Sequence, residues 1–225
     1  MKEVDEILNR LRSLGNDSVR KHNVKFGAGE NQFGVKMGDI RSIAAELKIQ
    51  PEFGWELWKT GNLEAQLLAI LLFQPKKLTQ EQLEELAETI SYFHVSDWFA
   101  SYLLKNHPSK ISLGEKWMNH PNIWKHRLSW SILAGRLAKK DPTLQPAHWL
   151  SMIEETLATT PFEIQWTMNS ALANIGIYWE NYRAEALRIG EKLGVYRDYP
   201  VSKGCTSPFA PIWINAMLGR ANEKS

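Results

Sequence analysis

Apolar residues recur at helical spacing through almost the whole chain, and this pattern constrains the fold more than any other feature. Val4, Ile7 and Leu11 mark the first apolar stripe. The run from Leu63 to Phe73 is nearly all apolar and predicts a central helix that is buried on most faces. No segment shows a sustained period of two bounded by hairpin turns, so a sheet is not expected. The sequence therefore predicts an all-α fold.

The predicted helices are short and are separated by tight breaks. The stretch Thr79-Gln80-Glu81-Gln82 has the form of a capped helix start. Many short helices joined by tight turns fit either a globular bundle or a solenoid of stacked helix pairs. A clear internal repeat is lacking, so the pattern alone leaves both architectures open. Helices are predicted over about 95–106, 109–119, 121–140, 146–159, 161–178, 180–193 and 208–219.

Composition bounds the compartment and the kind of partner. A formal net charge of +2 over 225 residues is too small to indicate a nucleic-acid partner, so such a partner would need a local concentration of Lys and Arg. The single cysteine, Cys205, excludes an intramolecular disulfide, lacks an evident base partner and is expected to be an inert packing residue. The charged, amphipathic start is unlike a signal peptide, and no apolar run approaches the roughly 20 residues of a membrane span. We expect a cytoplasmic protein without membrane contact.

The histidines do not form a metal-binding pattern. His120 and His126 are six residues apart and would lie on different faces of a helix, and no cysteine or acidic residue completes a site. No phosphate-binding loop or dinucleotide fingerprint occurs in the sequence. We therefore expect neither a metal ion nor a cofactor.

Three stretches carry a resemblance to a known family. They are Phe33-Gly34-Val35, the segment from Trp117 to Arg127 with Asn122-Ile123-Trp124 at its centre, and Phe162-Glu163-Ile164-Gln165. At low identity they resemble the AlkD-type alkylpurine DNA glycosylases, HEAT-like-repeat proteins that remove cationic alkylated bases. The resemblance implies an α-α superhelix, a HEAT-like repeat solenoid, with a single DNA alkylation repair domain over residues 1–225. It also implies that the protein is a monomer whose partner is double-stranded DNA, alkylated or distorted.

The chemistry of that family requires a carboxylate beside the sugar, which stabilises the cationic transition state. In register, the carboxylate position is Pro121, and the functional arginine falls at or near Ala173. Loss of a positioned acid or an electrostatic stabiliser costs ~10²–10⁴ in rate. The resemblance therefore implies weak or no base excision, and the catalytic residues stay unknown. Pro121 also fits the first turn of a helix, where its missing N–H costs nothing.

The resemblance also implies aromatic walls and a phosphate-binding surface. Trp117 would be the first wall, followed in order of preference by Trp213 and Trp166. Basic residues on the predicted helix 121–140 suggest a track along the DNA backbone, although a solvated helix face would give the same pattern. These basic residues are Lys125, Arg127, Arg136, Lys139 and Lys140.

Three functions follow from this pattern. The first is recognition of damaged or distorted DNA in a basic concave groove, without effective glycosidic hydrolysis. The second is an active alkylpurine DNA glycosylase in which Glu115, Glu163 or Asp141 replaces the missing carboxylate from another direction. The third is a HEAT-like scaffold for protein interaction, because concave repeat surfaces also bind polypeptides.

Overall fold

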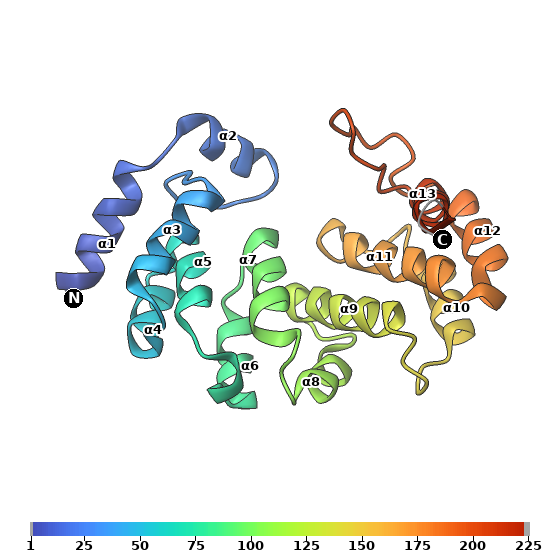
Figure 1. Ribbon diagram of the computed structural model, residues 1–225, viewed down its shortest axis with the longest axis horizontal. Helices are drawn as coiled ribbons and strands as arrows, with labels where there is room; N and C mark the ends of the chain where they lie inside the picture. The colour runs from blue at the N-terminus through green and yellow to red at the C-terminus, as the bar shows by residue number, and fades with distance from the viewer. Residues whose placement is uncertain (1, 223–225) are drawn as a thin grey trace. The chain divides into compact units, whose positions relative to one another are not determined.

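The computed structural model describes residues 2–222, and the regular structure in this range is helical, without strands (Figure 1). This confirms the predicted all-α fold. The chain divides into two compact units, unit 1 up to Leu113 and unit 2 from Gly114 onward. Within residues 2–222, no helix is both long enough and apolar enough to cross a membrane.

Unit 1 is built around α5 (Leu63–Leu72), which packs against its neighbours α3, α4 and α7. Nine of its ten residues are buried, including the polar Glu64 and Gln66, so the predicted central helix is confirmed. The other helical segments of the unit are α1 (Lys2–Ser13), α2 (Asp17–Lys25), α3 (Met37–Leu47), α4 (Pro51–Lys59), the 3-10 turn Pro75–Lys77, α6 (Gln80–Glu88), α7 (Phe93–Trp98) and its π-helical continuation Phe99–Leu104. The short helix α8 (Lys110–Trp117) begins in unit 1 and ends in unit 2.

Local sequence signals set several of these helix starts. Thr79 and Gln82 form the predicted capping box at the start of α6. Asn16 caps α2 by accepting from the Val19 N–H, a helix that was not predicted because its apolar stripe is weak. Pro51 occupies the first turn of α4, where a missing N–H leaves no bond unmade.

A buried carboxylate organises the loop that precedes α3. Glu64 is fully buried and accepts backbone N–H bonds from Phe33 at 2.9 Å, Gly34 at 2.8 Å and Val35 at 3.2 Å. Gly34 has a φ of +77°, and a Cβ at this position would overlap the Asn16 carbonyl oxygen. The Phe33-Gly34-Val35 segment is thus a structural element that holds the loop against α5.

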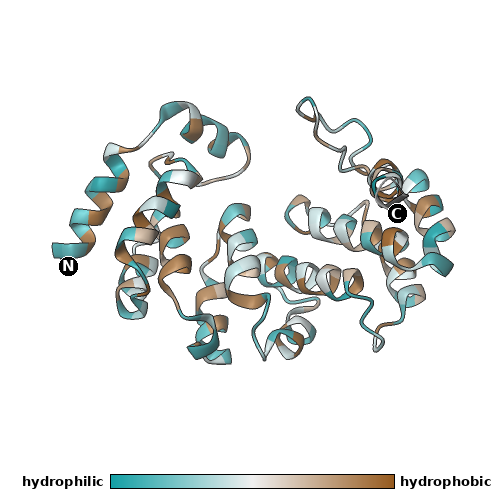
Figure 2. Cartoon of the chain, viewed as in Figure 1, coloured by the Kyte–Doolittle hydropathy of each residue, from teal (hydrophilic) through white to brown (hydrophobic). Residues whose placement is uncertain are grey.

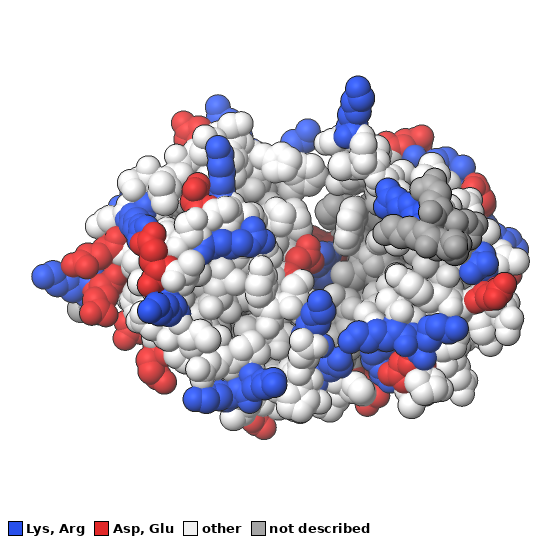
Figure 3. Space-filling view, viewed as in Figure 1, with Lys and Arg blue, Asp and Glu red and all other residues white. Residues whose placement is uncertain are grey.

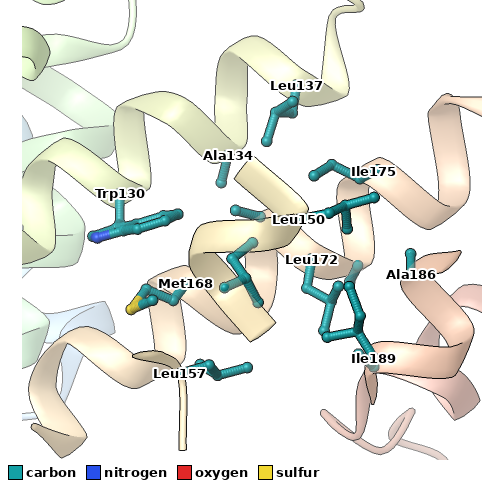
Figure 4. Packing of buried hydrophobic residues seen from close by; sticks show 14 of the residues in the cluster. Trp130, Ala134, Leu137, Leu150, Leu157, Met168, Leu172, Ile175, Ala186 and Ile189 are labelled. Atoms are coloured by element: carbon teal, nitrogen blue, oxygen red, sulfur yellow. The ribbon is translucent and has the colours of Figure 1, made fainter. Parts of the chain in front are cut away.

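Unit 2 is centred on α11 (Phe162–Tyr178), which packs most extensively against α9 (Ile123–Ala138) and also against the three other helices of the unit (Figure 1). Trp130, Ala134 and Leu137 of α9 point into the same core as Met168 and other residues of α11 (Figure 4). The remaining elements are α10 (Pro146–Thr156), the 3-10 turn Glu180–Tyr182, α12 (Arg183–Leu193) and α13 (Ala210–Asn222).

Polar bonds reinforce the packing of α11 against α9. The Asn174 amide donates to the Ala134 carbonyl at 2.9 Å, and the Trp179 indole N–H donates to the Leu137 carbonyl at 2.9 Å. Nine residues of α11 are buried, as expected for a helix that neighbours cover on several sides, and its ribbon carries both apolar and polar residues (Figure 2). The helices predicted over 161–178, 180–193 and 208–219 correspond to α11, α12 and α13 within a few residues.

We predict that Glu64→Gln lowers the free energy of unfolding by about 2–4 kcal/mol. Both carboxylate oxygens of Glu64 accept backbone N–H bonds, whereas the nitrogen of a glutamine amide cannot accept one. Urea unfolding followed by circular dichroism measures this change. Glu52→Gln, at an exposed position of α4, serves as the control and should stay within about 0.5 kcal/mol of the parent protein. Equal stability of the two variants would contradict a structural role for the Glu64 carboxylate.

Candidate nucleic-acid interface

Unit 2 contains a cavity of about 440 Å³ that brings together Trp166 of α11 and Trp213 of α13. Both indoles are half-buried, so part of each ring is accessible from the cavity. The two tryptophans are 47 positions apart in sequence, and the sequence reasoning named both as aromatic walls. The rest of the lining comes from the loop between α12 and α13: Tyr199, Pro200, Val201, Ser202, Cys205, Thr206, Ser207 and Pro208.

Close packing of α13 on α11 explains the position of Trp213. Gly176 of α11 lies so near Ile214 that a Cβ at Gly176 would overlap the Ile214 side chain. Ile214 is fully buried, whereas its neighbour Trp213 is directed to the half-buried edge of the helix. The glycine therefore permits the approach that places this indole beside the loop.

Two tyrosines extend the aromatic surface around Trp166. The Trp166 ring centroid lies 5.4 Å from that of Tyr196 and 5.9 Å from that of Tyr199, and the two tyrosine rings are 5.5 Å apart in an edge-to-face arrangement. Burial raises the pKa of the Tyr196 phenol, and the Arg127 charge partly opposes this effect. Tyr196 has a φ of +64°, and its hydroxyl has no hydrogen-bond partner among the residues that the structure describes.

Specific bonds hold the loop that forms the rest of the cavity. The buried Asn169 amide donates to the Pro208 carbonyl at 2.8 Å, and the Phe209 N–H donates to the Ser207 hydroxyl at 3.2 Å. Arg220 of α13 donates to the Thr206 hydroxyl at 2.9 Å, which places a cation at the edge of the cavity. The loop is thus fixed at its α13 end.

The lining of the cavity is aromatic, apolar and hydroxyl-bearing. Among the described residues that form it, none carries a carboxylate. Cys205 is exposed and lines the cavity, so its expected role as a packing residue is wrong. Such a surface can stack on a planar ring, and its described residues do not offer a carboxylate to a bound sugar.

Trp117, the first choice as an aromatic wall, is fully buried at the end of α8. Leu113, one helical turn earlier on the same face, is also fully buried, so the two side chains form the apolar stripe of a short helix. The Trp117 indole N–H has no hydrogen-bond partner within residues 2–222. The prediction that Trp117 lines an accessible groove is therefore wrong.

The predicted basic track is only partly exposed. Lys139 and Lys140 are exposed at the end of α9, whereas Lys125 is only 7% exposed and Arg127 only 3%. Arg127 donates from Nη1 to the Glu163 carbonyl at the start of α11, so its side chain links α9 to α11. The prediction of a continuous exposed track is therefore wrong, because Lys125 and Arg127 lie on the buried face of the helix. Lys and Arg are interspersed with Asp and Glu on the visible surface (Figure 3).

Arg136 is held in an ionic and hydrogen-bonded network. Its Nε donates to Asp141 at 2.8 Å, its Nη2 donates to the Thr143 hydroxyl at 2.9 Å, and its Nη1 lies 3.9 Å from the Glu115 carboxylate. Hydrogen bonds from Thr143 and from Arg136 lower the pKa of Asp141 to about 2. Arg136 is therefore already engaged, which argues against its predicted role as a phosphate contact.

None of the three acids considered as replacements for the missing carboxylate lines the aromatic cavity within the described part of the chain. Asp141 and Glu115 lie in the network around Arg136. The backbone carbonyl of Glu163 accepts from Arg127, and its side chain is half-buried at the start of α11. The structure therefore does not place a substitute acid beside the aromatic residues.

The start of α9 differs in detail from the sequence prediction. Asn122 is the N-cap, and its side chain accepts from the Trp124 N–H at 2.9 Å and the Lys125 N–H at 3.3 Å. Pro121 is exposed and precedes this cap, so its predicted place in the first helical turn is wrong. Ala173, at the expected arginine position, is fully buried in α11.

Sequence reasoning missed the two tyrosines and the loop that complete the cavity. Tyr196 and Tyr199 follow the end of α12, and the segment from Pro200 to Pro208 contains Gly, Ser and Pro, which predict a loop. The aromatic residues next to this loop were the available signal. Their meeting with Trp166 depends on tertiary packing that no local pattern records.

Comparison with known proteins identifies the family. The sequence profile described as DNA alkylation repair enzyme matches residues 7–193, and the chain belongs to this family. This confirms the family suggested by the sequence.

Relatives and a solved structure extend the comparison. An uncharacterised protein of Listeria innocua is 23% identical and covers 97% of this chain and 98% of its own. An uncharacterised protein of Listeria monocytogenes is 22% identical and covers 96% and 97%, respectively. A solved structure matches with a TM-score of 0.77 and 24% identity, over 96% of this chain and 94% of its own. It was described under "A new family of proteins related to the HEAT-like repeat DNA glycosylases with affinity for branched DNA structures". The fold is therefore HEAT-like, as predicted.

We predict that stability falls as the pH drops from 7.5 to 5.5, in part because of His126. Burial, with a smaller effect of His120, lowers the pKa of His126, and the His126 Nε2 accepts the Trp130 indole N–H at 3.1 Å. The contribution of neutral His126 is complete above the ordinary pKa of about 6.5 and is lost as the pH falls through the lower pKa of the folded state.

Urea unfolding at the two pH values tests this prediction. His126→Gln keeps an acceptor for the indole N–H and does not titrate, so it should reduce the fall in stability between pH 7.5 and 5.5. His148→Gln, at an exposed position, is the control and should leave the fall unchanged. An equal fall in all three proteins would exclude His126 as its source.

Proposed function

We propose that the protein binds distorted or branched double-stranded DNA and uses the aromatic cavity of unit 2 to stack on an unpaired base or an exposed sugar. The observation that carries this proposal is the cavity in which the half-buried Trp166 and Trp213 lie together with Tyr199. Stacking on an aromatic side chain tolerates any base, which suits recognition of DNA shape rather than of sequence. Monomeric state and cytoplasmic location stay predictions.

Two comparisons support this proposal. The chain belongs to a DNA alkylation repair family, and the similar solved structure comes from a family reported to have affinity for branched DNA structures. A branch point interrupts the continuous base stack of a duplex, and an aromatic cavity can stack on a base that is open at this interruption. Exposed cations, among them Arg220 at the edge of the cavity and Lys140 just after the end of α9, can contact phosphates.

The proposal does not include glycosidic hydrolysis. The family's carboxylate position is Pro121, and the cavity lining carries no carboxylate among the residues described. Breaking a glycosidic bond develops positive charge on the sugar, and a carboxylate is the group that stabilises it. Incubation with alkylated duplex should release no 7-methylguanine or 3-methyladenine above the rate without protein.

Anisotropy titrations against a four-way junction, a plain duplex and an alkylated duplex test the proposed function. We expect the tightest binding to the junction, with an affinity that falls as salt rises. Absence of salt-sensitive binding to all three would overturn the proposal. Release of alkylated bases would instead support an active glycosylase.

We predict that Trp213→Ala weakens junction binding by about 5- to 150-fold, because stacking on one accessible base contributes roughly 1–3 kcal/mol. Trp166→Ala should act in the same direction. Trp149→Ala is the matched control, since Trp149 is also half-buried in unit 2 but does not line the aromatic cavity. If the three variants bind alike, the cavity is not the contact surface.

We also predict that the double variant Lys139→Ala/Lys140→Ala reduces the slope of log affinity against log salt by about 1–2, since each neutralised phosphate contributes about 0.9. Both lysines are exposed at the end of α9. Lys76→Ala/Lys77→Ala removes a second adjacent exposed pair, in unit 1, and should leave the slope unchanged. A slope that changes equally in both double variants would assign the effect to net charge.

A further inference from the structure

Unit 1 contains a second cavity, of about 440 Å³, that the proposed function does not use. It is lined by Trp55 and Trp58 of α4, Gln66 of α5 and Glu85 of α6, together with four residues at its rim. The volume falls in the range of roughly 300–1,000 Å³ that small-molecule sites occupy. The rim residues are Lys59, Gly61, Thr89 and Ser91.

The most informative residue of this cavity is Gln66. It is only 3% exposed, on the helix at the centre of unit 1. Its side-chain amide makes no hydrogen bond to any other described residue, in contrast to Glu64 on the same helix, which makes three. Its polar atoms are not among the buried atoms that lack a partner, so they are accessible from the cavity that Gln66 lines. Gln66 therefore presents two hydrogen-bond donors and one acceptor to a ligand in this cavity.

The walls of the cavity are aromatic and already fixed. Trp58 donates its indole N–H to the Thr89 hydroxyl at 2.8 Å, and Thr89 donates in turn to the Leu86 carbonyl at 3.3 Å. Trp55 packs edge-to-face on Phe73 with ring centroids 5.3 Å apart and is half-buried. The two indoles are thus held in place without a ligand and supply a rigid apolar surface for a planar group.

The two charged residues of the lining indicate a ligand that has no strong charge of its own. Lys59 and Glu85 are both exposed and of opposite sign. A phosphate would meet the Glu85 carboxylate, and a cation would meet the Lys59 ammonium. A neutral ring with polar edges fits this pair best.

We propose that this cavity binds a neutral nucleobase, with Gln66 hydrogen-bonded to the edge of the base and the indoles against its face. A glutamine amide offers one acceptor and two donors side by side, which match a ring edge that carries an adjacent donor and acceptor. The base could be supplied by a free nucleoside or by an unpaired nucleotide of a DNA strand, and the recognition chemistry is the same. The proposal concerns unit 1 and does not rest on the aromatic cavity of unit 2.

Calorimetric titrations with the full chain test the proposal and distinguish the two sources. One arm uses adenosine, guanosine, cytidine and thymidine. The other uses a short single-stranded oligonucleotide and the same strand with abasic sites. Saturable nucleoside binding supports a free ligand; binding of the base-bearing strand without binding of nucleosides or of the abasic strand supports a strand-borne base.

The variants assign the binding to this cavity. Gln66→Leu and Trp55→Ala should each weaken it tenfold or more, whereas Trp55→Phe, which keeps an aromatic ring, should retain most of it. Gln165→Leu is the matched control, because it makes the same exchange at a half-buried amide of unit 2 that is bonded to the Leu157 carbonyl.

Stability of Gln66→Leu provides an independent readout. Replacing an amide that lacks a partner should leave the thermal midpoint unchanged or raise it, whereas Gln165→Leu loses a hydrogen bond and should lower it. The proposal is overturned if neither nucleosides nor base-bearing strands bind, or if they bind equally to the parent protein, Gln66→Leu and Trp55→Ala. Because the Trp213→Ala assay on junction DNA addresses unit 2, failure here leaves that result unaffected.

Discussion

Burial of α11 is the constraint on which unit 2 depends. Its apolar surface is covered by α9 and by the other helices of the unit, so its core positions are occupied by small or aliphatic side chains. Gly176 allows α13 to pack closely, and this approach places Trp213 beside the cavity that Trp166 also lines. The aromatic surface is therefore a product of core packing: it exists because two helices meet at small residues. The same helix accepts the bond from Arg127 at its first turn, which removes that guanidinium from the exposed surface.

Sequence reasoning succeeded where the determining interactions are local. The capping box of Thr79 and Gln82, the apolar run of α5 and the breaks around α11 were all predictable, because each depends on neighbours within a few positions. It failed where exposure depends on tertiary packing. Trp117 and Lys125 have residue types typical of a nucleic-acid surface, yet both are buried, since the faces of short helices can be assigned only when their neighbours are known. Trp166 and Trp213 were predicted as walls, whereas Tyr199 and the loop beside it were not.

The positions of the acidic residues favour DNA binding over glycosidic hydrolysis as the role of the aromatic cavity. A carboxylate in a glycosylase site must lie beside the sugar. Asp141 and Glu115 do not line the aromatic cavity; they face Arg136 in a separate ionic network. Glu64 provides a contrast, because its buried carboxylate is satisfied by three backbone N–H groups and so has a structural explanation. The side-chain amide of Gln66, two residues later, has no such bonds within the described part of the chain. Within one helix, the presence and absence of partners distinguish a residue that holds the fold from a residue that is available to a ligand.

The location of Cys205 gives the molecule a built-in attachment point. It is the chain's sole thiol, it is exposed, and it lies on the loop that borders two indoles. A maleimide dye would therefore couple at one known position without any substitution elsewhere. Its emission would respond to whatever displaces solvent from the space between Trp166 and Trp213, so the native sequence already carries a site-specific optical reporter.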